Sequence, residues 1–210
     1  MNSQHRKSTR LPISMKMMQD LIRQEEISDE EYGLVYRSPF NTLLVDAIVT
    51  DGRAARSDAR YYPYERVLPT AGDGAAIVPV CHNKLVLLKQ FRHALRDCQL
   101  SFPRGFAEPE EPADVTAQRE LGEEIGAAGV DTPQYLGVIA PDSGLTSRRT
   151  RVYAVAIVSY RKDGSKDSEG ICSISEATPE ELSTSIRQGD IDDGYTIGAF
   201  VLWMLSRQQA

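Results

Sequence analysis

Apolar and polar residues follow two different spacings along this chain, and the spacings predict where strands and helices lie. Short apolar runs bounded by turn residues are typical of strands. Such runs predict two strands within residues 32–68, in NTLLVDAIVTDG and RYYPYERVL, and a hairpin of GAAIVPV and KLVLLKQF that turns at His82 and Asn83. Further along, the same pattern predicts strands in PQYLGVIA, TRVYAVAIVSY and CSISEA.

Apolar residues three and four positions apart predict helices over residues 14–27, 112–125, 179–188 and 195–207. The third of these begins with a capping box at residues 178–181. The run FVLWML in the last helix is too short to span a membrane and is predicted to be buried packing. Strands on both sides of a central helix, with further helices at the end, predict the α/β class: an α/β/α sandwich around a mixed sheet.

The same pattern predicts the division of the chain. Residues 1–31 are expected to form a tail and a helix, residues 32–71 a small β subdomain with a probable dimer contact, and residues 72–210 the main domain. Two strand runs with many apolar side chains form at best a marginal unit alone, so they need another surface to bury. We therefore expect a homodimer.

Composition and charge limit which binding partners and which cellular compartment are expected. The 210 residues are 41% hydrophobic and carry a net charge of −6, which argues against nucleic acid or an anionic membrane as the main partner. No apolar run is long enough for a membrane span, and the start lacks a secretory signal, so a cytoplasmic location is expected. Cys81, Cys98 and Cys172 are an odd number without framework spacing, and reduced thiols are expected.

The candidate chemistry lies between Gly105 and Ala127, in GFAEPEEPADVTAQRELGEEIGA. Pro112 suits the first position of a helix, and Gly126 suits the residue just past its end. Glu120 and Glu124 then stand one turn apart on a common face, with Glu123 beside them. Such carboxylates either form a solvated acidic face or bind a hard cation, for which Mg²⁺ with a substrate phosphate is the natural choice.

This stretch resembles the Nudix box of the Nudix hydrolases, G-x5-E-x7-R-E-U-x-E-E-x-G-U, in which U is an apolar residue, and it meets every position. Outside the box, the chain is most similar to ADP-ribose pyrophosphatases and related nucleotide-sugar hydrolases. That similarity rests on Gln90-Phe91-Arg92, residues 101–106, Pro141, the loop 143–147 and IRQGDIDDGYTIGAF near the end. Arg104 departs from the alanine common in that group, so the substrate preference stays open.

The resemblance implies Mg²⁺-dependent hydrolysis of the diphosphate in ADP-ribose or a related nucleoside diphosphate sugar, giving AMP and a sugar phosphate. Mn²⁺ is a possible substitute for Mg²⁺. Glu120 and Glu124 are expected to be metal ligands. Glu123 is expected to bind the metal directly or through water, and Arg104 to add its carbonyl. Arg119 and Glu111 are expected to form a structural pair.

The remaining site residues are also implied by the resemblance. Arg92 is expected to contact the diphosphate, with a surface salt bridge as its alternative role, and Arg104 lies where substrate binds. Glu169, in the acidic loop 162–170, is the expected general base, with Glu123, Asp163 and Asp167 as alternatives. The adenine is expected to stack on an aromatic side chain supplied by one of these residues: Tyr32, Tyr36, Phe40, Tyr61, Tyr62 and Tyr64.

Two alternative functions stay open at this point. One is a Nudix pyrophosphatase for another dinucleotide or for coenzyme A. The other is a nucleotide sensor that binds without catalysis. The resemblance further implies that the N-terminal strand subdomain is exchanged across the homodimer.

Overall fold

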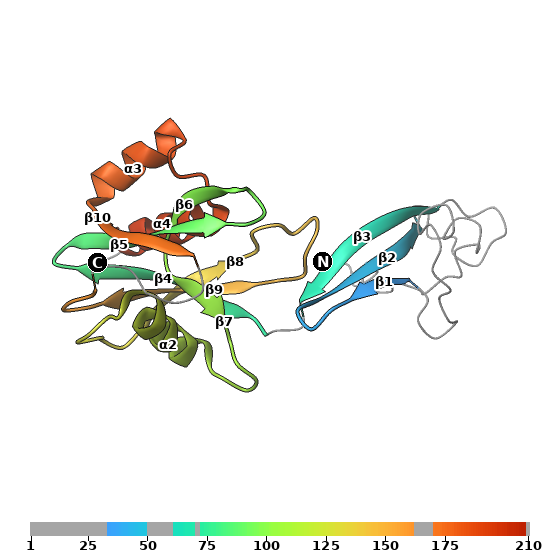
Figure 1. Cartoon of the computed structure of the whole chain (residues 1–210), viewed down its shortest axis with the longest axis horizontal. Coiled ribbons are helices and arrows are strands. Elements are labelled where there is room, and N and C mark those ends of the chain that lie inside the picture. The colour runs from blue at the N-terminus through green and yellow to red at the C-terminus, as the bar shows by residue number, and fades with distance from the viewer. Residues whose placement is uncertain (1–32, 50–60, 70–71, 162–169, 209–210) are drawn as a thin grey trace. The chain divides into compact units, whose positions relative to one another are not determined.

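The computed structural model describes residues 33–49, 61–69, 72–161 and 170–208 (Figure 1). The chain forms two compact units: one comprises the chain up to Thr70 together with Asp142–Arg148, and the other comprises Ala71–Pro141 and Arg149–Ala210. The predicted tail and helix over residues 1–31 lie outside the described residues, and so does Glu169.

The smaller unit contains an antiparallel sheet of three strands, in the order β1 (Leu34–Arg37), β2 (Asn41–Val49) and β3 (Tyr61–Pro69). The two predicted strands are confirmed as β2 and β3, and β1 was not predicted. The loop Asp142–Arg148 belongs to this unit because it attaches to β3. The Val67 N–H donates to the Leu145 carbonyl at 2.7 Å, and the Tyr64 hydroxyl donates to the Gly144 carbonyl.

The larger unit is built on a seven-stranded sheet with the order β10-β5-β4-β9-β8, in which β6 pairs with β5 and β7 pairs with β4. Strands β4 and β9 are parallel and the other pairs are antiparallel, which confirms the predicted mixed sheet. The strands are β4 (Gly74–Cys81), β5 (Lys84–Arg92), β6 (Asp97–Ser101), β7 (Arg104–Phe106), β8 (Gln134–Ile139), β9 (Thr150–Ala156) and β10 (Ile171–Ala177).

The hairpin between β4 and β5 turns at the predicted residues. His82 and Asn83 have φ angles of 49° and 66°, and two consecutive positive φ values are typical of the tight turn that matches the twist of a hairpin. The two strands are buried along most of their length, since helices cover both faces of the sheet. This double burial explains why they read as nearly continuous apolar runs.

Helices cover the two faces of this sheet and create two hydrophobic cores, which confirms the α/β/α sandwich. Helix α2 (Ala113–Ile125) packs Leu121 and Ile125 on the face that includes Ile77. Helices α3 (Pro179–Gln188) and α4 (Gly194–Ser206) pack on the face that includes Val78. Because successive side chains of a strand point to opposite faces, neighbouring residues of β4 serve different cores.

Two local expectations need correction. Pro112 has an extended ψ of 144° and is the N-cap of α2, so the helix begins at Ala113. The run FVLWML is only partly buried: Phe200 and Trp203 are covered, whereas Val201 and Leu205 are about half exposed. A helix on the outside of a sheet buries one face only, and this accounts for the exposed positions.

The predicted capping box of α3 is confirmed, because Thr178 and Glu181 exchange hydrogen bonds. Within the described residues, no helix has the length and apolar character needed to cross a membrane.

Candidate active site

The candidate site forms where β7 passes the carboxylate face of α2. Gly105 is the residue of closest approach: a Cβ atom at this position would lie 1.8 Å from Glu120 Oε1. The glycine therefore leaves a space that the Glu120 carboxylate occupies. At the other end of the helix, Gly126 ends α2 in the left-handed conformation with φ of 57°. The geometry therefore explains why glycine occupies both positions, Gly105 and Gly126.

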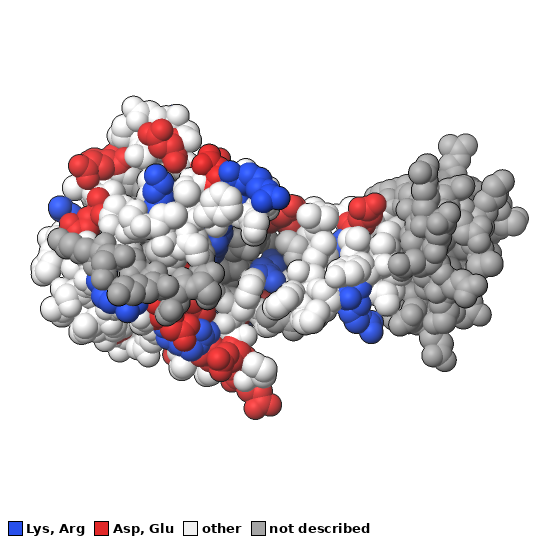
Figure 2. Space-filling view, viewed as in Figure 1, with Lys and Arg blue, Asp and Glu red and all other residues white. Residues whose placement is uncertain are grey.

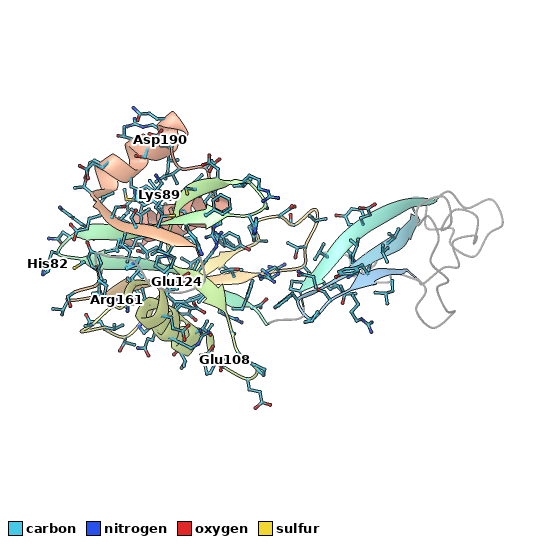
Figure 3. The ribbon with its side chains drawn as sticks, in the orientation of Figure 1. His82, Lys89, Glu108, Glu124, Arg161 and Asp190 are labelled. Atoms are coloured by element: carbon cyan, nitrogen blue, oxygen red, sulfur yellow. The ribbon has the colours of Figure 1, made fainter. Side chains whose placement is uncertain are left out.

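Two of the three candidate metal ligands are buried. Glu120 is 7% exposed and Glu124 is 5% exposed, whereas the Glu123 side chain is 59% exposed. Glu124 Oε2 accepts a hydrogen bond from the Arg104 backbone N–H at 3.0 Å, and Figure 3 shows Glu124 where α2 faces the sheet. A buried carboxylate needs compensating partners. A solvated acidic face therefore describes Glu123 but not the other two residues.

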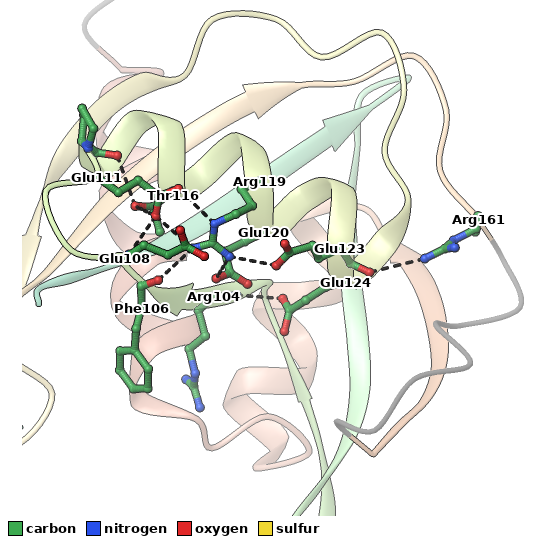
Figure 4. A network of polar contacts seen from close by, with 11 residues as sticks. Arg104, Phe106, Glu108, Glu111, Thr116, Arg119, Glu120, Glu123, Glu124 and Arg161 are labelled. Atoms are coloured by element: carbon green, nitrogen blue, oxygen red, sulfur yellow. Dashed lines mark hydrogen bonds and ion pairs between the residues drawn. The ribbon is translucent and has the colours of Figure 1, made fainter. Parts of the chain in front are cut away.

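Arg119 connects the motif into one network of charges (Figure 4). Its guanidinium donates to both oxygens of Glu111 at 3.0 Å, which confirms the predicted pair. The same group donates to Glu120, Glu123 and the Phe106 carbonyl, each at 2.8 Å. The hydrogen bond with Glu111 is the main reason that the pKa of Arg119 is raised. The loop before α2 and the carboxylate face are therefore held by one cation.

The residues present fit a hard cation, although they do not form a finished cage. Among the residues that the structure describes, no three His, Cys, Asp or Glu side chains converge as a metal cluster. Arg119 pairs with both Glu120 and Glu123, so its guanidinium occupies one oxygen of each of these carboxylates. The donors available to a cation are the two buried carboxylates, Glu120 and Glu124, one helical turn apart, and the neighbouring backbone of Arg104 and Gly105. Mg²⁺ commonly uses one or two carboxylates and leaves its other positions to water and phosphate.

The side chain of Arg104 is held by α4, which the sequence analysis did not anticipate. Its Nη1 lies 2.8 Å from both carboxylate oxygens of Asp193, and its guanidinium carbon lies 4.1 Å from the Tyr195 ring centre. Burial alone would raise the pKa of Asp193, but attraction and hydrogen bonding by Arg104, with help from Thr196, hold that pKa below its usual value. Asp193 is also the N-cap of α4. An Asp at a predicted helix start was an available signal for this cap, although not for its contact with Arg104.

Two further predicted site residues outside the motif are Arg92 and Glu169, and the structure describes only the first of them. Arg92 ends β5, and its Nη2 donates to the hydroxyl of the buried Ser101 at 3.3 Å. Ser101 lies shortly before β7, so Arg92 contacts the segment that leads into the site. Within the motif, Glu124 lies at the Arg104 backbone and Glu120 at Gly105, whereas Glu123 pairs with Arg119 at the exposed side of α2. Residues 162–169, which include the predicted general base Glu169, lie outside the described residues.

We expect Gly105→Ala to lower metal affinity and activity together. The added methyl group would need the space of the Glu120 carboxylate, the far end of a flexible side chain, so the carboxylate should move and the fold should survive. Displacing a positioned ligand should cost about 10–100-fold in metal affinity. Manganese titration followed by calorimetry measures this. Gly122→Ala is the matched control, because an added Cβ there meets nothing within 4 Å. Equal affinities in the two variants would refute the role of Gly105.

We expect Glu111→Gln to reduce stability at neutral pH and to lose this effect in acid. Hydrogen bonds from Arg119 and from the Glu108 amide lower the pKa of Glu111 from 4.5 to about 2. A carboxyl whose folded-state pKa is depressed contributes stability above its unfolded-state pKa and loses it as pH falls through the folded-state value. The difference in free energy of unfolding between wild type and variant should therefore shrink as pH falls from 4.5 to about 2. Urea unfolding at several pH values tests this, with the exposed Glu110→Gln as control. A constant difference across that range would contradict the assignment.

Charges of both signs alternate over the larger unit on the face shown in Figure 2, and its described residues form no extended basic surface in that view. Lys and Arg residues there lie among Asp and Glu residues. This distribution agrees with the overall charge of −6. On this face, the described residues supply no continuous cationic track of the kind that binds a nucleic acid backbone.

Comparison with known proteins identifies similar chains. The chain is 34% identical over 92 residues to an ADP-sugar pyrophosphatase of Mus musculus, covering 41% of this chain and 42% of that protein. It is 34% identical over 68 residues to the ADP compounds hydrolase NudE of Escherichia coli (strain K12), covering 32% of this chain and 37% of that protein. The chain thus spans about two fifths of the length of these curated relatives.

A crystal structure described as an ADP compounds hydrolase has the same fold. It matches with a TM-score of 0.66 at 19% identity, over 84% of this chain and 93% of that chain. Residues 70–196, more than half of the 210 residues, match the family described as NUDIX domain, and this range includes the whole motif from Gly105 to Ala127. The chain therefore belongs to the NUDIX domain family.

Proposed function

We propose that this protein hydrolyses the diphosphate linkage of ADP-ribose or a related nucleoside diphosphate sugar, giving AMP or another nucleoside monophosphate and a sugar phosphate. The observation that carries the proposal is the pair of buried carboxylates, Glu120 and Glu124, beside the Gly105 backbone in a NUDIX domain. The names of the ADP-sugar pyrophosphatase and the ADP compounds hydrolase support the substrate class. The cytoplasmic location stays a prediction.

Glu120 and Glu124 would hold Mg²⁺, with Mn²⁺ as a substitute. Glu123, which is exposed, would reach the metal directly or through water, and the Arg104 carbonyl is a further donor. When bound, the metal neutralises charge on the diphosphate and makes water more acidic. The chain's own contribution is to fix the carboxylates, since Arg119 and the Arg104 amide hold them before any ligand arrives.

Two arginines are proposed to contact the substrate. Arg92 carries a guanidinium that fits phosphate oxygens bidentately, and its contact with Ser101 places it next to the segment leading to β7. Arg104 is fixed by Asp193 and Tyr195, so it would meet substrate as an oriented cation rather than as a mobile one. Glu169 would accept the proton of the attacking water, with Glu123, Asp163 and Asp167 as alternatives.

A substrate panel tests the proposal. The protein is incubated with Mg²⁺ or Mn²⁺ and ADP-ribose, nucleotide sugars, dinucleotides or coenzyme A, and the products are separated by chromatography. We expect AMP and a sugar phosphate from ADP-ribose or a related nucleoside diphosphate sugar at the highest kcat/KM. Faster turnover of a dinucleotide or of coenzyme A would shift the assignment to that class. Binding of ADP-ribose without turnover of any compound would favour a nucleotide sensor.

We also propose a homodimer formed through the smaller unit. Among the described side chains of β1, β2 and β3, only Val45 belongs to the buried hydrophobic set, whereas Tyr36 is 62% exposed and Phe40 is 75% exposed. A three-stranded sheet with exposed aromatic residues gains stability by covering them with a second copy. Tyr36 and Phe40 are also proposed candidates for stacking the adenine.

We expect light scattering of the full chain at micromolar concentration to give twice the mass of one chain. Phe40→Asp should shift the equilibrium toward monomer, because it places a charge in the proposed interface. Leu95→Asp is the matched control, since Leu95 is also exposed, at 57%, but lies in the larger unit. If the wild-type chain stayed monomeric, the proposed homodimer would be rejected. The proposal that a partner subunit supplies the residue that stacks the adenine would be rejected with it.

A further inference from the structure

Two cysteines from distant parts of the sequence lie next to each other outside the carboxylate site. Cys98 is on β6 and Cys172 is on β10, the two strands that pair with β5 from opposite sides. Their Sγ atoms are 3.8 Å apart. Cys172 is exposed and Cys98 is half-buried, whereas the third cysteine, Cys81, is buried.

Local backbone geometry explains how side chains on two non-adjacent strands can meet. The register between β10 and β5 shifts between Ile171 and Ser173, so Cys172 occupies the irregular position. Such a bulge bends a strand and re-aims its side chain. Gly170, with φ of 73°, comes directly before, and its carbonyl accepts a hydrogen bond from the Phe91 N–H at 2.9 Å. The start of β10 is thereby fixed on β5 while the Cys172 side chain turns toward β6.

We propose that Cys98 and Cys172 are a modification site at which a hydroperoxide forms a reversible intramolecular disulfide bond. The sulfur atoms of a disulfide are about 2.05 Å apart, so the two Sγ atoms must approach by about 1.8 Å. Because the two cysteines lie on strands that flank β5, and bonded cysteines have Cα atoms within about 7 Å of each other, the starts of β6 and β10 must also move toward each other. Cys172 is exposed and Cys98 is half-buried, so a small oxidant can reach the pair, which is the usual setting of a redox-sensitive pair rather than of a structural bridge.

The chemistry assigns different parts to the two sulfurs. The hydrogen bond with Cys172, and then burial, raise the pKa of Cys98, so Cys98 retains its proton. The more exposed Cys172 meets the oxidant first, and its deprotonated form is the one that reacts, as for any thiol. It attacks one oxygen of hydrogen peroxide, the O–O bond breaks, and a sulfenic acid and hydroxide form. The Cys98 sulfur then attacks the sulfenic sulfur, and its proton leaves with the displaced hydroxyl as water. Two sulfurs are oxidised by two electrons in total, and the peroxide is reduced.

The product would tie β6 to β10 across β5. The bond would lie beside Phe91, which pairs with Cys98 and bonds to Gly170. Arg92 is the next residue of β5, so the tether would fix the strand end that carries this arginine. The inference itself needs only the geometry of the two thiols and does not depend on the proposed hydrolysis.

The test uses the full chain with and without hydrogen peroxide, followed by alkylation, tryptic digestion and mass spectrometry. We expect most oxidised molecules to lose roughly 2 Da, the mass of two hydrogens. A linked pair of peptides, 97–104 and 167–187, should appear and should vanish on reduction with dithiothreitol. Cys98→Ser and Cys172→Ser should each abolish the link, and Cys81→Ser, which removes the buried thiol, should preserve it.

The peroxide experiment on the wild-type chain tests the proposed disulfide even if a cysteine variant folds poorly. The proposal is overturned if Cys98 and Cys172 both remain open to alkylation after peroxide treatment, or if they pass to sulfinic and sulfonic acids without a link. A bond between two chains, or one that involves Cys81, would also overturn it. Non-reducing electrophoresis separates the intermolecular product from the intramolecular one.

Discussion

Glu124→Gln is expected to remove most hydrolytic activity while leaving the fold intact. The substitution takes one negative charge from a buried pair of carboxylates, so divalent metal affinity should fall. The loss in kcat/KM should be at least about 100-fold, above the range for residues that only support metal ligands. The glutamine amide still offers an oxygen to the Arg104 N–H, which is the partner of Glu124 Oε2. Thermal unfolding and circular dichroism should therefore change little.

The measurements are steady-state kinetics across a range of Mg²⁺ concentrations and calorimetric titration with Mn²⁺. Asp114→Asn is the matched control, because it removes the same charge from the first turn of α2, where the side chain is exposed. We expect that variant to behave as wild type. If Glu124→Gln kept both its metal affinity and its rate, the buried carboxylates would have a purely structural role.

Glu169→Gln is expected to cause the second large loss of activity. Unlike Glu124→Gln, it should lower kcat without lowering metal affinity. In the proposed site, a bound metal would occupy the oxygens of the motif glutamates, so the proton of the attacking water would need an acceptor from elsewhere. Removing a positioned general base should lower kcat by about 10²–10⁴. Metal affinity should stay unchanged, since Glu169 lies outside the motif. The contrast with Glu124→Gln separates a base from a metal ligand.

The controls for this prediction are the neighbouring loop acids. Asp163→Asn and Asp167→Asn should each retain most activity if Glu169 is the base. A decrease in kcat of less than about fivefold for Glu169→Gln, far below the range expected for a base, would reject the assignment. Glu123→Gln would then be the next variant to measure, because the exposed Glu123 side chain is the motif carboxylate that water reaches most easily.

Several features of the fold could be predicted because they depend on short stretches of sequence. The turn at His82 and Asn83 follows from residues that tolerate positive φ. The carboxylate spacing on α2 follows from the helical repeat alone. The pairing of Arg119 with Glu111 was implied by the resemblance to a known motif. In each case the information lies within a few turns of the chain.

The features that escaped prediction join residues far apart in sequence. Arg104 and Asp193 are 89 residues apart, and Cys98 and Cys172 are 74 apart. Neither pair has a local pattern that signals it, because each depends on how strands and helices pack. The half-exposed face of α4 was missed for the same reason: the composition of FVLWML is apolar throughout, and only the packed structure shows which side is covered.

The attachment of the loop Asp142–Arg148 to β3 changes how the chain can be divided. The smaller unit is discontinuous, so no single cut yields it as a separate piece. A cut between Thr70 and Ala71 would put β3 and the loop on different fragments, although Tyr64 and Val67 donate hydrogen bonds to that loop. Transplanting the first 70 residues onto another NUDIX domain would likewise require the matching loop between β8 and β9, since the two segments form one transferable module.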